Sequence, residues 1–314
     1  MFNRILVPLD RSPLAECVLP HAIALAHSLD AQLLLLHVLS LPAKQDGLRA
    51  VDSLGWQLRR AEAESYLHGV CTRMQEAGVG CNVQISEGDA AEKIVACAQD
   101  NEIGLVLIAS HGQSGLSAWH VSSVVQKVIV RAHTSLMIIR AQQPMQSEIA
   151  SLHYRRVLAP LDCSVRAECV LPLAAALTRL PDTQLLLAHV VQHPQMPRRT
   201  PLSREDSDLA DRLVERNFSE AGDYLEMIRS QQPLAATETR LLIADHVICS
   251  LHSLMEQEQI DLVLLCAHGV SGQMDWPHGC LVASFIAYGT SSLLIFQDAP
   301  SDQDASTTHN GNRR

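Results

Sequence analysis

Two aspartates stand where a carboxylate could contact a ligand, each at the end of an apolar run. Asp10 ends the run ILVPLD, and Asp162 ends the corresponding run VLAPLD. A carboxylate at the end of a buried strand is well placed to accept hydrogen bonds from a bound molecule. The alternative is a structural role, because Asp-x-Ser is a good signal for a helix start. Ser12 and Ser164 would then cap the helices that follow.

A histidine-glycine pair followed by small residues forms a second candidate site in each half of the chain. Glycine lets backbone N–H groups approach a phosphate, and the N-terminus of a following helix adds a partial positive charge. A plain strand–loop–helix turn with serine capping is the alternative. The residues concerned are His111, Gly112, Ser122 and Ser123 in the first half, and His268, Gly269 and Gly279 in the second.

The second half also carries residue types that bind metals. Two thiolates and two imidazoles would suit tetrahedral zinc. Their spacing matches no specific zinc motif, and a buried thiol at the end of a strand is the other interpretation of the first cysteine. We therefore expect no metal site. The candidates for one are Cys266, His268, His278 and Cys280.

The arrangement of nucleophiles and histidines does not indicate catalysis. His37 and His189 lie near the ends of apolar runs, where we expect structural hydrogen bonds. No Ser-His-Asp or Cys-His order recurs between the halves in a way typical of nucleophilic enzymes. The sequence therefore favours a binding protein over an enzyme, and no catalytic residue is assigned.

These candidate residues belong to two copies of one sequence. The segment RILVPLDRSPLAECVLP, from residue 4, returns as RVLAPLDCSVRAECVLP from residue 156, and IGLVLIASHG, from residue 103, returns as IDLVLLCAHG from residue 260. A repeat of this length is a duplicated domain and not a unit of a solenoid. We expect domains at 1–142 and 153–297, followed by a disordered tail at 298–314 that lacks anchoring apolar residues.

Within each copy, continuous apolar runs alternate with segments of helical periodicity. In the first copy the runs are 5–9, 33–38, 81–85, 105–109 and 136–139, and the helical segments are 13–28, 55–77, 89–99 and 120–132. Runs that are apolar throughout predict strands buried on both faces, hence an α/β fold with two doubly wound parallel five-stranded sheets and helices on both faces.

Ligands of such folds lie at the carboxyl ends of the strands. The connections 40–53 and 192–208 should be mobile loops over these ends. The residues brought to this edge are Asp10, Val38, His111 and Gly112 in the first copy, and Asp162, Val190, His268 and Gly269 in the second.

The overall composition excludes several classes of protein. The 314 residues carry a formal net charge of -10 and no basic block of the kind that binds nucleic acid. No stretch approaches the roughly 18–20 uninterrupted apolar residues of a membrane span, and the first apolar run is too short for a signal peptide. The nine cysteines, several of them inside apolar runs, indicate reduced thiols. We therefore expect a soluble cytoplasmic protein.

The quoted motifs resemble those of the universal stress protein family, over nearly all of the chain and twice. The resemblance covers ILVPLD and VLAPLD, the strands LLLHV and LLAHV, and the loops SHGQSGLS and AHGVSGQM. It implies a Rossmann-like fold, similar to adenine nucleotide alpha hydrolases, in which the first aspartate contacts the nucleoside end of a bound nucleotide. ATP-binding members carry Gly-x-x-Gly, nine residues, then Gly-Ser or Gly-Thr. That motif falls on Ala109, Gly112, Ser122 and Ser123 in the first copy, and on Cys266, Gly269, Gly279 and Cys280 in the second.

The resemblance also implies a function and an assembly. We expect a regulatory stress-response protein that binds ATP or another adenine nucleotide in at least one copy, with weak ATP hydrolysis left open. The family implies pairing through the last strands, 135–139 and 292–296, within the chain or in a homodimer. Two alternatives stay open. One is a scaffold or adaptor whose cleft holds another small or apolar ligand, and the other is a metal or thiol sensor in the second copy.

Overall fold

The computed structural model describes residues 2–40, 53–112, 121–140, 152–179, 182–194, 203–231, 236–269 and 278–297. Most of the two connections predicted as mobile loops, at 41–52 and 195–202, lies outside the described residues, as does the predicted disordered tail. No described helix is long and apolar enough to cross a membrane. All nine cysteines are described, and all are free thiols.

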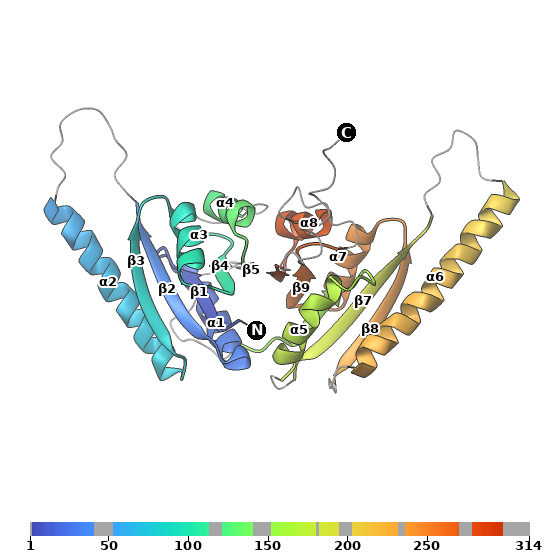
Figure 1. Ribbon diagram of the computed structural model, residues 1–314, viewed down its shortest axis with the longest axis horizontal. Coiled ribbons are helices and arrows are strands. Elements are labelled where there is room, and N and C mark those ends of the chain that lie inside the picture. The colour runs from blue at the N-terminus through green and yellow to red at the C-terminus, as the bar shows by residue number, and fades with distance from the viewer. Residues whose placement is uncertain are drawn as a thin grey trace, which may run out of the picture.

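The strands form a single ten-stranded sheet, in the order β3-β2-β1-β4-β5-β10-β9-β6-β7-β8 (Figure 1). The first half supplies β1 Arg4–Pro8, β2 Gln32–Leu39, β3 Cys81–Glu87, β4 Leu105–Ala109 and β5 Ser135–Ile139. The second half supplies β6 Arg156–Pro160, β7 Gln184–Gln192, β8 Thr237–Ala244, β9 Leu262–Cys266 and β10 Ser292–Phe296.

The predicted α/β class with a parallel five-stranded sheet in each half is confirmed, but the two sheets are continuous. They join where β5 and β10 pair antiparallel, with Met137 opposite Leu294. Each strand would otherwise be an open sheet edge, so the pairing hides backbone groups that could recruit another chain.

The helices follow the same order in both halves. The first half has α1 Leu19–Leu29, α2 Ser53–Glu76, α3 Ala90–Asp100 and α4 Ser123–Arg131, and the second has α5 Leu171–Leu177, α6 Arg204–Gln231, α7 Val247–Gln257 and α8 Cys280–Tyr288. Short 3-10 turns, Ala15–Val18 and Ala167–Val170, precede α1 and α5, so the segment predicted as a helix from residue 13 begins irregularly. The predicted loop to residue 208 is wrong at its end, because α6 already begins at Arg204.

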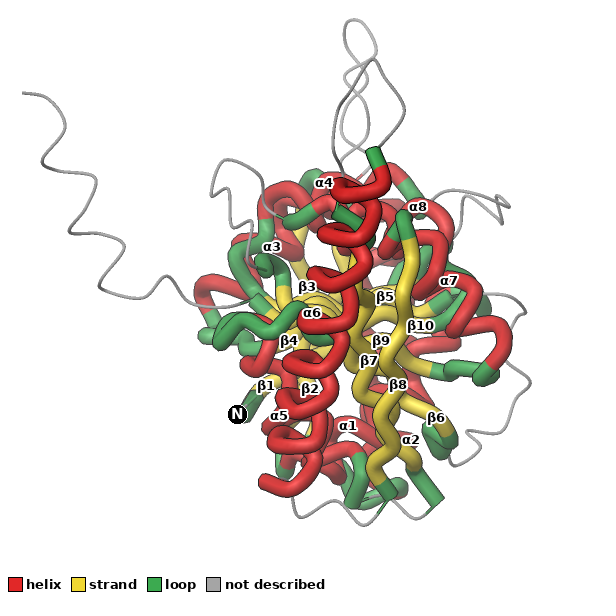
Figure 2. The backbone as a smooth tube through the Cα atoms, turned by 90° about the vertical axis from the view of Figure 1, so that its right-hand side faces the viewer, coloured by secondary structure: helices red, strands yellow, loops and turns green. Residues whose placement is uncertain are grey.

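Two hydrophobic layers cover the two faces of the sheet, and both run through the two halves. On β1, Ile5 and Val7 face the layer that holds α1, α2, α5 and α6, whereas Leu6 faces the layer that holds α3, α4, α7 and α8. This alternation explains why each strand is apolar throughout. In Figure 2, α6 lies along β7 and β8 at the outer end of the sheet, as α2 does along β2 and β3 in Figure 1.

Side chains reinforce the junction between the halves. His21 of α1 lies 2.6 Å, Nδ1 to hydroxyl, from Tyr154, which stands just before β6. From the end of β5, Arg140 donates to the carbonyl oxygens of Phe285 and Ile286, at 2.6 and 2.8 Å, and so caps the last turn of α8. Charged donors to the last carbonyls of a helix are favourable.

Candidate functional site

One cavity of the first half collects all the predicted binding residues of that half. It has a volume of about 480 Å³ and lies at the carboxyl ends of β1, β2 and β4, against the N-terminal end of α4. The structure thus brings together residues that are up to about a hundred positions apart in the chain. The predicted residues that line it are Asp10, Val38, His111, Gly112, Ser122 and Ser123.

Asp10 has the structural role considered for it, and it also lies at the cavity where a ligand contact was predicted. Its Oδ1 accepts hydrogen bonds from the backbone N–H of Ser12, at 3.0 Å, and from the Ser12 hydroxyl, at 2.6 Å. The hydroxyl oxygen of Ser12 in turn accepts from the backbone N–H of Ala15, at 3.1 Å, and so caps the turn that leads into α1. The turn holds the carboxyl group in place, and Asp10 also lines the cavity.

Gly112 is a glycine because the Asp10 carboxylate lies against it. A Cβ at position 112 would stand 2.0 Å from Oδ2 of Asp10, a distance that no real contact allows. The close approach of backbone and carboxylate therefore requires the absence of a side chain. Any larger residue would displace Asp10, the loop, or both.

Ser122 and Ser123 open α4 at the wall of the cavity. Ser122 is the N-cap, and its hydroxyl accepts from the backbone N–H of Val125 at 3.3 Å. Its own N–H donates to the carbonyl of Ser110, at 2.8 Å, which ties the helix start to the end of β4. The helix N-terminus supplies a partial positive charge at the cavity, although the Ser122 hydroxyl is already engaged in capping.

Histidines fix the ends of the strands beside the cavity. His37 is buried, and its Nδ1 donates to the carbonyl of Leu9 at 2.7 Å. His189 makes the same contact with Leu161 in the second half, also at 2.7 Å. The predicted structural role of both histidines is confirmed, and the bond holds Val38 of β2 beside the end of β1.

Three residues of the cavity mouth were not predicted from the sequence. Arg11 lies in the left-handed region, with φ at 68°, and forms an ion pair with Glu62 of α2 at 3.3 Å. Trp56 and Arg59 come from the first turns of α2, and the Arg59 guanidinium lies 5.4 Å from the centre of the Trp56 ring. All but Glu62 line the cavity. The i, i+3 spacing of a tryptophan and an arginine on one helix face was the available signal.

The second half repeats the framework of the site. Oδ1 of Asp162 accepts from the backbone N–H and the hydroxyl of Ser164, at 3.1 and 2.5 Å. A Cβ at Gly269 would stand 2.3 Å from Oδ2 of Asp162, as at Gly112. Gly279 is the N-cap of α8 but provides no side-chain capping bond. Val190 lies 8% exposed within the hydrophobic layer of α7 and α8.

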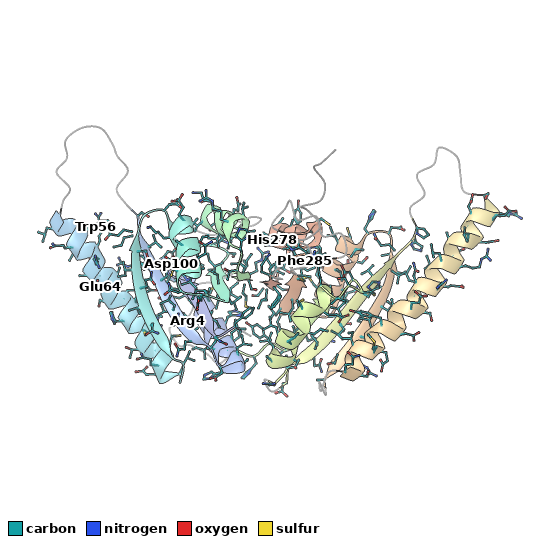
Figure 3. The ribbon with its side chains drawn as sticks, viewed as in Figure 1. Arg4, Trp56, Glu64, Asp100, His278 and Phe285 are labelled. Carbon is teal, nitrogen blue, oxygen red and sulfur yellow. The ribbon has the colours of Figure 1, made fainter. Side chains whose placement is uncertain are left out.

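The residues considered for a metal do not assemble into a metal centre. Among the described residues, no group of three or more His, Cys, Asp or Glu side chains could hold a metal ion. His278 instead reaches across to the first half, where its Nε2 lies 3.2 Å from the carbonyl oxygen of Ile129 in α4 (Figure 3). Burial lowers the pKa of His278, with a smaller contribution from His268 and an opposing effect of the bond to Ile129.

Comparison with known proteins places both halves in one family. The family model described as the Universal stress protein family matches residues 1–140 and again residues 153–285. A universal stress protein of Methanocaldococcus jannaschii is 28% identical over 142 residues, which cover 45% of this chain and 83% of that protein. A universal stress protein of Synechocystis is 28% identical over 152 residues, covering 44% of this chain and 98% of that protein.

Among solved structures, the likeness extends over the whole tandem arrangement. The crystal structure of a universal stress protein from Archaeoglobus fulgidus aligns with 95% of this chain and 97% of its own, with a TM-score of 0.61 and 17% identity. At this identity the likeness concerns the fold alone.

Proposed function

This chain belongs to the universal stress protein family, and we propose that it is a cytoplasmic, regulatory stress-response protein that binds an adenine nucleotide, ATP in the first instance, in its first half. The observation that carries the proposal is the cavity of about 480 Å³ on which Asp10, Gly112 and Ser123 converge. In this proposal the protein is regulated by whether the cavity holds a nucleotide, and not by hydrolysis of that nucleotide.

The chemistry of the cavity wall matches the parts of a nucleotide. Leu36, Ile94 and Ile108 give it apolar surface for a base. The Asp10 carboxylate can accept hydrogen bonds from amino or hydroxyl groups. The N-terminus of α4, opened by Ser123, favours a phosphate. The glycine losses of the phosphate motif at Ala109 and Ser122 point to an affinity lower than that of an intact motif, because side chains now crowd the loop.

A test begins with whatever the native protein carries. Small molecules released from the purified full-length chain by denaturation would be identified by mass spectrometry. ATP would then be titrated calorimetrically into folded protein from which any bound small molecule has been removed. Adenine nucleotide in the extract, or saturable ATP binding, is the expected result.

The same experiment addresses the alternative of an apolar or other small ligand, which the apolar wall of the cavity favours. The nucleotide proposal would be contradicted if the extract contained such a molecule and no nucleotide, and if titration of folded protein with ATP gave no binding heat.

A further inference from the structure

The mouth of the first-half cavity has an aromatic and cationic side, which is formed by residues outside the glycine loop. Trp56 stands near the N-terminal end of α2 (Figure 3), Arg59 lies one turn further along that helix, and Arg11 follows β1. Trp56 is only partly buried, and Arg59 is exposed. A large aromatic ring in such a position, beside an open cavity, offers a flat apolar surface to a ligand.

The fold does not need these residues, because the second half keeps the same framework without them. The two long helices share a register, since Tyr66 donates to Glu16 at 2.9 Å and Tyr224 donates to Glu168 at 3.0 Å. Leu67 and Leu225, the next residues, are both fully buried. In this register Trp56 and Arg59 correspond to Val214 and Asn217, and the repeat that begins at residues 4 and 156 matches Arg11 with Cys163.

The replacements remove both chemistries at once. Val214 is 7% exposed and packs inward, and a valine offers no ring for stacking. Neither Cys163 nor Asn217 carries a positive charge at neutral pH. A feature that is present in one copy only, and that does not support the shared core, is best explained by a ligand of that copy.

The charge of the mouth indicates the class of that ligand. Among the described residues that line the cavity, two arginines accompany one aspartate. One of them, Arg11, is paired with Glu62, whereas the guanidinium of Arg59 stacks near the Trp56 ring. An anion that bears a flat ring can therefore use both groups, the ring on the indole and the negative charge near the guanidinium.

We propose that Trp56 and Arg59 are the specificity residues of the first-half site: Trp56 stacks on the base, and Arg59 selects nucleotides over nucleosides. This inference rests on the proposed nucleotide function and adds to it a recognition surface on α2. It locates base recognition on a helix and not on the glycine loop, so it is independent of the losses in the phosphate motif.

The test compares variants of the full chain in calorimetric titrations with ATP, adenosine and inorganic tripolyphosphate. Stacking of a base on an aromatic side chain contributes about 1–3 kcal/mol, so Trp56→Ala should weaken ATP binding by about 5- to 150-fold. Trp56→Phe should recover most of the loss, and tripolyphosphate binding should not change. Arg59→Ala should weaken ATP binding more than adenosine binding. Leu58→Ala, an exposed position on the same helix that does not line the cavity, is the matched control.

A second measurement keeps Trp56 in place. The chain has two other tryptophans, Trp119 and Trp276. In a chain with both replaced by phenylalanine, ATP should quench the remaining fluorescence, and tripolyphosphate should not. If wild-type protein binds ATP while Trp56→Ala binds it equally well and no quenching occurs, the recognition surface is wrong and the nucleotide function stands. If folded wild-type protein binds no ATP at all, the nucleotide function fails and this inference with it.

Discussion

The two halves of the molecule share a core and differ at one rim. In both, an aspartate after the first strand accepts from a serine two residues later and lies against a glycine after the fourth strand. In both, a tyrosine of the long helix donates to a glutamate of the short 3-10 turn. The contacts that hold the strand ends together have therefore been kept in each copy.

The side chains that face the ligand region have not been kept. The first half presents an arginine, a tryptophan and a second arginine, where the second presents Cys163, Val214 and Asn217. The N-cap of α4 is Ser122, with a capping hydroxyl, whereas that of α8 is Gly279. The difference teaches that the aspartate–glycine contact is part of the framework, so its presence does not by itself identify a binding copy.

The largest expected effect comes from filling the aspartate–glycine contact in each half separately. Gly112→Val places a side chain where a Cβ would be 2.0 Å from Asp10, and it should reduce ATP affinity at least 100-fold, about 2.7 kcal/mol, in calorimetric titration. Gly269→Val is the matched control, with a Cβ 2.3 Å from Asp162.

Both substitutions overpack a similar turn and should cost about 1–3 kcal/mol of stability. The comparison breaks if Gly269→Val removes ATP binding as fully as Gly112→Val, or if Gly112→Val retains it.

A smaller effect concerns the junction between the halves. The polar pair His21 and Tyr154 occupies positions that correspond, in the other copy of the repeat, to an apolar pair. His21 and Tyr154 match Leu173 and Phe2 in the repeat. Burial lowers the pKa of His21 to about 4, from an ordinary value of 6.5. Below pH 6.5 the unfolded chain binds a proton at His21 that the folded chain excludes. The free energy of unfolding is therefore not reduced by His21 above pH 6.5, and it falls progressively as the pH is lowered toward 4. The loss amounts to up to about 3 kcal/mol.

Denaturant unfolding at a series of pH values would measure this effect. The double variant His21→Leu with Tyr154→Phe copies the apolar pair, and its free energy of unfolding should depend less on pH between 4 and 6.5. An unchanged slope in this window would show that His21 does not titrate as its burial implies.

The smallest expected effect concerns the N-caps of α3 and α7, the third helices of the two halves. Asp89 caps α3 by accepting from the backbone N–H of Glu92 at 3.1 Å, whereas His246 at the start of α7 makes no side-chain capping bond. Asp89→Ala should destabilise the protein by about 1 kcal/mol, and His246→Asp should stabilise it by about 0.5–1 kcal/mol. Thermal unfolding of the two variants checks both signs, and a loss of stability in His246→Asp would contradict the capping account.

Much of the fold could be predicted from the sequence. The two hydrophobic layers bury both faces of the strands, so each strand appears in the sequence as a continuous apolar run. Leu105 and Val106 are fully buried on opposite faces, and the predicted strand 105–109 is found at those bounds. The start of α6 was missed because Arg204 and its neighbours are polar and show no apolar period. The signal was local: the hydroxyl of Ser203 accepts from the backbone N–H of Asp206 at 3.2 Å, the pattern of a capping box.

The candidate site was predictable only in part. Residues next to strand ends, such as Asp10 and Gly112, could be assigned to one edge because parallel strands end together. The i, i+3 spacing of Trp56 and Arg59 puts them on one face of a predicted helix, but it does not assign them to this edge, since the periodicity of α2 does not show how its first turns overhang the sheet. That placement depends on tertiary packing, in which Leu67, Val70 and Met74 are buried against the strands.

The central claim is that the nucleotide site lies in the first half, and photolabelling tests it most directly. The full-length protein would be irradiated with 8-azido-ATP, with and without excess ATP, and digested for peptide mapping by mass spectrometry. The account predicts ATP-protected labels on peptides of the first half, with α2 near Trp56 among them. Protected labels confined to peptides of the second half, around Asp162 and Gly269, would contradict it.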